Sequence, residues 1–60
     1  MDSNYSYSIH PSGYVSIKNL IGETIAVIDF EEQLNFTKSI SIEIKEEVKT
    51  FLKNNDIPFF

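Results

Sequence analysis

The feature that most restricts the fold is a strict two-residue alternation near the start of the sequence. Residues 5–9 alternate large apolar side chains with serines, which is the period of a strand with one buried face. Pro11 then fixes its own φ near the value a turn needs, and Gly13 tolerates a positive φ. Because the alternation resumes over residues 14–18, the sequence predicts a β-hairpin of strands 5–9 and 14–18.

A glycine-containing turn leads to a third stretch, residues 24–30, that is almost continuously apolar. Strand alternation places Ala26, Ile28 and Phe30 on one face and Ile25 and Val27 on the other. A strand that is apolar on both faces is usually covered on both, so we expect a second element or a partner over its outer face. Three strands joined by short turns predict an antiparallel meander.

Residues 31–39 form a polar linker to the last element, which is expected to be a helix over residues 41–54. The segment 39–45 fits either a strand or the start of this helix, because its isoleucines alternate. Beyond that segment the helix is favoured, with Ser41 as the N-cap, an acidic first turn and Lys53 in the last turn. The apolar stripe of this helix consists of Ile40, Ile44, Val48, Phe51 and Leu52.

The chain ends in an extended apolar tail, residues 56–60. Pro58 cannot continue the helix and holds Ile57 in extended geometry. Terminal segments fray unless something anchors them, so Phe59 and Phe60 are expected to dock on their own chain or on another. The sequence thus predicts a single domain of residues 1–60 in the α+β class. Its elements are a small antiparallel three-stranded β-meander, one C-terminal α-helix packed on one face, and a short extended C-terminal segment.

The chain lacks the cysteines and clustered histidines with which many small domains form stabilising disulfides and metal sites. It has 60 residues, no cysteine and one histidine, so disulfides and thiolate metal sites are excluded. A core of this size barely offsets the entropy of ordering the chain. Self-association or a partner protein is the remaining source of additional stability.

The charge argues against two classes of partner. Nine acidic residues stand against five lysines, with no arginine, for a net charge of −4. Binders of nucleic acid and of anionic membranes depend on basic residues, so direct binding to either is not expected. No apolar run reaches membrane-spanning length and no basic, apolar signal sequence begins the chain, so a cytoplasmic location is predicted.

No residue pattern predicts a catalytic, cofactor-binding or metal site. His10 is the sole candidate general base, but it precedes Pro11 in an expected turn, where histidines are usually solvated. Glu31 and Glu32 are adjacent and face opposite ways on an extended segment, so they do not form a catalytic pair. We therefore expect a protein that is not an enzyme and that needs no cofactor.

The chain has more apolar side chains than one helix can cover, because a single helix covers one face of a sheet. Aromatic residues are enriched at the centres of protein interfaces. The residues predicted to contact a partner are Tyr5, Tyr7, Tyr14, Phe59 and Phe60, with Glu31 and Glu32 at the rim.

These observations predict a small non-catalytic protein-binding module. The expected role is an intracellular inhibitor or regulatory adaptor that acts as a homodimer and occludes its partner stoichiometrically. The composition, rich in Ile, Lys and Asn, indicates an AT-rich genome such as that of a phage or mobile element. The alternative is an acidic mimic of nucleic acid that blocks a DNA- or RNA-binding protein, although the acids are scattered for that role.

Overall fold

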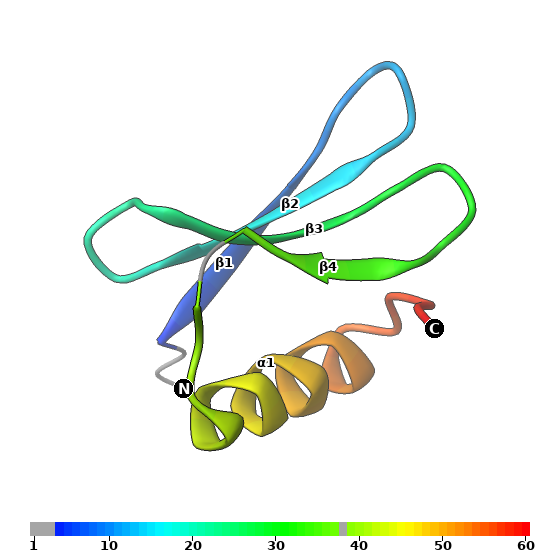
Figure 1. Ribbon diagram of the computed structural model, residues 1–60. Coiled ribbons are helices and arrows are strands. Elements are labelled where there is room, and N and C mark those ends of the chain that lie inside the picture. The colour runs from blue at the N-terminus through cyan, green and yellow to red at the C-terminus, as the bar shows by residue number, and fades with distance from the viewer. Residues whose placement is uncertain (1–3, 38) are drawn as a thin grey trace.

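The protein forms one antiparallel sheet with a single helix across one face (Figure 1). The computed structural model describes residues 4–37 and 39–60. Its elements in chain order are β1 (Tyr5–Ile9), β2 (Val15–Asn19), β3 (Thr24–Ile28), β4 (Leu34–Phe36) and α1 (Ile42–Asn54). The strand order β1-β2-β3-β4 follows the sequence, so the α+β class and the meander are as predicted.

The sheet has four strands, so the prediction of three is wrong. The additional strand, β4, lies inside the segment 31–39 that the sequence presents as a polar linker, and it pairs Leu34 with Ile28 and Phe36 with Ala26. Three residues are too few to show a strand period, and the flanking residues are polar. Strand β3 also ends two residues earlier than expected, because Asp29 begins the tight turn into β4.

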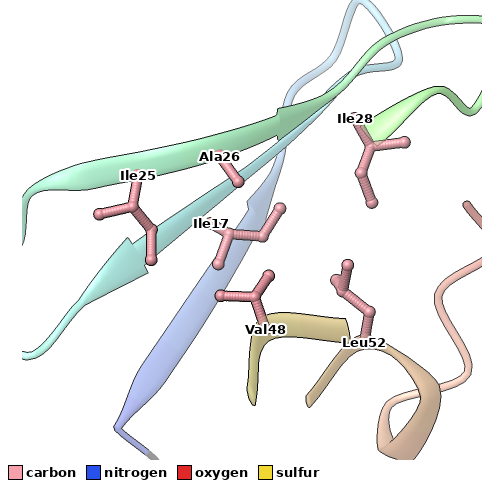
Figure 2. Close-up of a cluster of buried hydrophobic side chains, with 6 residues drawn as sticks. All are labelled: Ile17, Ile25, Ala26, Ile28, Val48 and Leu52. Atoms are coloured by element: carbon pink, nitrogen blue, oxygen red, sulfur yellow. The ribbon is translucent and has the colours of Figure 1, made fainter. Parts of the chain in front are cut away.

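A β-bulge between β2 and β3 brings Ile25 into the core. Ile17 pairs with Ala26 but Lys18 pairs with Thr24, which leaves Ile25 as the extra residue. The bulge interrupts the alternation, so Ile25 and Ala26 both become buried on the helix side (Figure 2). The sequence had placed Ile25 on the outer face. The buried core consists of Ile17, Ile25, Ala26, Ile28, Val48 and Leu52.

Helix α1 is fixed at both ends by local hydrogen bonds. The Ser41 hydroxyl accepts a hydrogen bond from the Ile44 amide at 3.3 Å, as expected of an N-cap. At the other end the Asn55 side chain donates to the Phe51 carbonyl at 2.8 Å. Because the helix begins at Ile42, the segment 39–45 is a helix start and not a strand. Ile42 itself, off the apolar stripe, is 76% exposed.

The C-terminal tail docks on its own chain. Ile57 and Phe59 pack against the core, and the Leu34 amide of β4 donates to the Phe60 carbonyl at 3.1 Å. The Phe60 amide donates in turn to the Glu32 carbonyl at 2.6 Å. Phe60, the last residue of the tail, therefore pairs with the outer edge of β4 at Leu34. Within residues 4–37 and 39–60, no helix has the length and apolar character needed to cross a membrane.

Candidate protein-binding site

The seven residues predicted to form an interface lie in two separate places. Tyr5 and Tyr7 lie on β1 at the helix side of the sheet. The others lie at or near the end of the molecule where the β1–β2 turn, the β3–β4 turn and the C-terminus meet (Figure 1). We call this second place the hairpin end and define it by His10, Tyr14, Phe30, Glu31, Glu32 and Phe60.

Tyr5 and Tyr7 are held by the helix. Their rings lie 6.0 Å and 6.1 Å from the ring of Phe51, and Tyr7 remains 41% exposed. The Tyr5 hydroxyl donates a hydrogen bond of 2.6 Å to a carboxylate oxygen of Glu47. Partial burial raises the pKa of the Tyr5 phenol to about 12, helped by the hydrogen bond and by the negative charge of Glu47. Both rings therefore contribute to packing as well as to the surface.

An aromatic cluster forms the first half of the hairpin end. The rings of His10 and Tyr14 stack at a centroid distance of 4.0 Å, and Phe30 meets Tyr14 edge-on at 6.3 Å. A methyl group on Gly13 would lie 3.4 Å from the Phe30 ring, so the β1–β2 turn packs directly against this side chain. Phe30 is nevertheless 69% exposed. The cluster thus presents a supported but largely open aromatic ring.

Glu31 and Glu32 follow Phe30 in the β3–β4 turn, which is held by hydrogen bonds. The Asp29 carboxylate accepts hydrogen bonds from the amides of Glu31 and Gln33, at 2.9 Å and 3.0 Å. Glu32 adopts a φ of 64°, a left-handed conformation that glycine would occupy with less strain. The turn is therefore held in a geometry that keeps both glutamates exposed.

The two terminal phenylalanines have different surroundings. Phe59 is half-buried against the core, whereas the Phe60 ring is 81% exposed although its backbone pairs with the β3–β4 segment. Phe60 is therefore the one of the pair that presents its ring to the surroundings. Its position next to Glu32 places it at the hairpin end.

His10 and Ser16 form the closest approach to a catalytic pair. The His10 Nε2 lies 3.1 Å from the Ser16 hydroxyl, and Ser16 is 7% exposed. A reactive serine needs an accessible hydroxyl and a third group that orients the histidine. Among the described residues no carboxylate bonds to His10, whose ring instead stacks on Tyr14. The contact with His10 gives the buried Ser16 hydroxyl a hydrogen-bond partner. Separately, the described residues contain no group of three or more His, Cys, Asp or Glu side chains that could hold a metal ion.

Two grooves flank the helix, one lined in part by Tyr5 and the other in part by Phe59 and Phe60. One, of about 430 Å³, lies between the β2–β3 turn and the start of α1 and is lined mainly by Leu20, Ile21, Ile25, Ile40 and Ile44. The other, of about 680 Å³, lies between α1, β4 and the tail. Its lining combines the row Lys45, Lys49 and Lys53 with apolar side chains and includes no carboxylate side chain.

Sequence reasoning missed Phe30 as a surface residue. Strand alternation placed it in the core with Ala26 and Ile28, but the strand ends at Ile28 and Phe30 lies in the turn. The signal that could have found it is Asp29, because aspartate at the first position of a turn commonly accepts bonds from the amides that follow. Leu20 and Ile21, 76% and 84% exposed, were likewise missed as surface residues.

A scan against protein-family models, a search of curated proteins and a search of solved structures each return no match for this chain.

Proposed function

We propose that this chain is a small non-catalytic protein-binding module, an inhibitor or regulatory adaptor that acts in the cytoplasm as a homodimer. It would occlude its partner by covering part of the partner's surface, in the way of the small antagonists that phages and mobile elements encode. The partner is another protein, and neither nucleic acid nor a membrane is bound directly.

The observation that carries this proposal is the hairpin end. Two phenylalanine rings there, Phe30 and Phe60, are 69% and 81% exposed, and each residue is supported by the fold. Phe30 rests against Tyr14, and the backbone of Phe60 is bonded to Glu32. An aromatic side chain on a fixed backbone has few torsions to restrict on binding, and aromatic residues often supply much of the energy of an interface.

The carboxylates at this end supply the rim of such an interface. Glu31 and Glu32 are exposed within the same turn as Phe30, and the described residues of this turn include no lysine. Exposed charges around an apolar centre steer a partner and fix its orientation more than they add affinity. A partner with an apolar pocket bordered by lysine or arginine side chains fits this arrangement.

Mimicry of nucleic acid is supported less well. That role calls for a regular array of carboxylates, but the acids of this chain are scattered over the β2–β3 turn, the β3–β4 turn, α1 and the tail. On the helix they share the surface with lysines, and Glu46 lies 3.7 Å from Lys49. Reversing the charge of Glu31 and Glu32 to lysine separates the two roles. An occluding module should lose mainly association rate, whereas a mimic should lose binding altogether.

The test is affinity capture with a matched pair of double variants. Phe30→Ala with Phe60→Ala removes both exposed rings of the hairpin end. Leu20→Ala with Ile21→Ala removes equally exposed apolar side chains from the β2–β3 turn at the opposite end of the sheet. We expect the wild type and the β2–β3 variant to capture the same dominant protein and the hairpin-end variant to lose it at least about tenfold.

Circular dichroism and urea unfolding should show that both variants keep the wild-type fold, because none of the four side chains is buried. Equal capture by all three proteins, or loss in the β2–β3 variant alone, would contradict the proposal for the hairpin end.

A further inference from the structure

Strand β1 forms an edge of the sheet that the described residues leave open. It comes first in the strand order, and in the described part of the chain β2 is the one strand that pairs with it. Natural edge strands are usually protected by charge, proline, a bulge or short length. Strand β1 has five residues in unbroken register with β2, no bulge, no proline and no charged side chain.

The backbone groups of Tyr7 and Ile9 point outward from this edge. The His10 amide donates to the Tyr14 carbonyl at 2.8 Å, which places His10 in a hydrogen-bonded pair with β2. Bonded and non-bonded pairs alternate along an antiparallel ladder, so Ser8 and Ser6 also bond inward. Tyr7 and Ile9 occupy the intervening positions, where both the N–H and the C=O face away from the sheet.

The side chains beside these groups suit a second copy of the same strand. Tyr7 and Ile9 are 41% and 67% exposed on the helix side, and Ser8 is exposed on the other face. If two β1 strands pair antiparallel about a two-fold axis at Ser8, Tyr7 of each copy faces Ile9 of the other. Aromatic and β-branched side chains are favourable cross-strand neighbours, and serine then faces serine.

This register also satisfies the outward backbone groups. Tyr7 of one copy and Ile9 of the other form a hydrogen-bonded pair, and the two-fold axis repeats it, so four hydrogen bonds form. The axis is perpendicular to the sheet and leaves both helices on the same face. A partner strand of unrelated sequence would have to supply the same spacing of groups, whereas a second copy does so by symmetry.

We propose that two copies of this chain join through antiparallel β1–β1 pairing with Ser8 on the two-fold axis, forming a continuous eight-stranded sheet. This inference rests on the proposed homodimer and names its surface. In this register His10 of each copy faces Ser6 of the other, whereas Tyr14, Phe30 and Phe60 of the hairpin end lie outside the paired strands and remain for the partner protein.

The first test uses charge at Ser8. Sedimentation velocity should show the wild type shifting from monomer to dimer as its concentration rises. Ser8→Lys and Ser8→Glu each place like charges opposite one another, so the dissociation constant should rise at least about tenfold in either variant alone. An equimolar mixture of the two variants should restore the dimer as a heterodimer.

Ser6→Lys is the matched control. Ser6 lies on the same exposed face of β1, but in the proposed register it faces His10 of the other copy and not another Ser6. This variant should dimerise more strongly than Ser8→Lys. The recovery of the mixed Ser8 variants shows that each one folds.

The second test reads the register by cross-linking, which is simple because the chain has no cysteine. Residues of a non-hydrogen-bonded pair have Cα atoms about 4.5 Å apart, within reach of a disulfide. Ser8→Cys should therefore form a covalent dimer on mild oxidation, whereas Ser6→Cys should not.

A wild type that stays monomeric at millimolar concentration would overturn the proposal. So would a dimer that withstands Ser8→Lys, or one that Ser6→Cys cross-links more readily than Ser8→Cys. These outcomes are independent of partner capture, which is measured with the Phe30 and Phe60 variants. A monomer that still captures its partner would overturn the β1 pairing and the homodimer but leave the occluding role, and a dimer that captures nothing would overturn the occluding role alone.

Discussion

The two edges of the sheet differ in how they are protected. Strand β4 has three residues, its Leu34 amide is bonded to the tail, and Lys45 lies 5.5 Å above the Phe36 ring. Strand β1 has five residues and no charge, and the described residues add no pairing segment outside it. A short, covered edge resists association, while a longer, uncovered edge favours it. The tail thus covers one edge at Leu34, whereas the described residues leave the other edge open.

The largest expected effect comes from releasing the tail from the β4 edge. Phe59→Ala should lower the free energy of unfolding by about 2 to 3 kcal/mol, because a half-buried ring leaves the core. Phe60→Ala is the control and should cost less than about 0.5 kcal/mol, because its ring is 81% exposed and its backbone bonds remain. Urea unfolding measures both. Equal losses in the two variants would show that the tail does not dock as described.

The next effect concerns the helix that supports the β1 edge. Phe51→Ala removes the ring that both Tyr5 and Tyr7 contact, so we expect a loss of about 1 to 2 kcal/mol in urea unfolding. Backbone exchange in β1 should accelerate while exchange in β4 stays near the wild-type rate. A uniform acceleration across the sheet would argue against a separate role for this contact.

The turns that lead to the two edges offer a smaller test. Glu32, before β4, has a φ of 64°, whereas the β1–β2 turn has glycine, Gly13, at its positive φ of 112°. Glu32→Gly should relieve strain and stabilise the protein by at most about 1 kcal/mol in urea unfolding. Gly13→Ala should destabilise it through the positive φ, because the new methyl group would make only ordinary van der Waals contact with Phe30 at 3.4 Å. A loss of stability in Glu32→Gly would contradict the strain at this turn.

The smallest effect is a pH dependence at the β1 edge. The pKa of Tyr5 is raised from 10.0 to about 12, so the folded state favours the protonated phenol. The corresponding contribution to stability is complete below pH 10 and is lost as the pH rises through 12. Tyr5→Phe should remove this dependence, which chemical unfolding at several alkaline pH values would detect. An identical alkaline decline in wild type and variant would assign it to other groups.

Much of this fold could be predicted from the sequence, because the residue patterns that specify most of its elements are local. The alternation of residues 5–9, the glycine turns and the capping serine Ser41 each predict an element that the structure contains. Strand β4 gave no such signal, because its pairing with β3 and the tail depends on contacts distant in sequence. The bulge at Ile25 was equally hidden, since it depends on the register between two strands.

The candidate site was predictable only as a set of residue types. Tyr14, Glu31, Glu32 and Phe60 were named from composition and position, and the fold brings them to one end. Sequence alone could not separate Phe60 from Phe59, because their exposure depends on how the tail meets β4. The sequence also could not show that Tyr5 and Tyr7 lie on the β1 edge, apart from the residues of the hairpin end.

The most direct test of the difference between the two edges is amide hydrogen exchange measured at several protein concentrations. The account predicts that the outward amides of Tyr7 and Ile9 exchange more slowly as concentration rises, while the outward amide of Phe36 in β4 keeps one rate. Exchange rates at Tyr7 and Ile9 that do not change with concentration, or protection that grows at Phe36 instead, would contradict it.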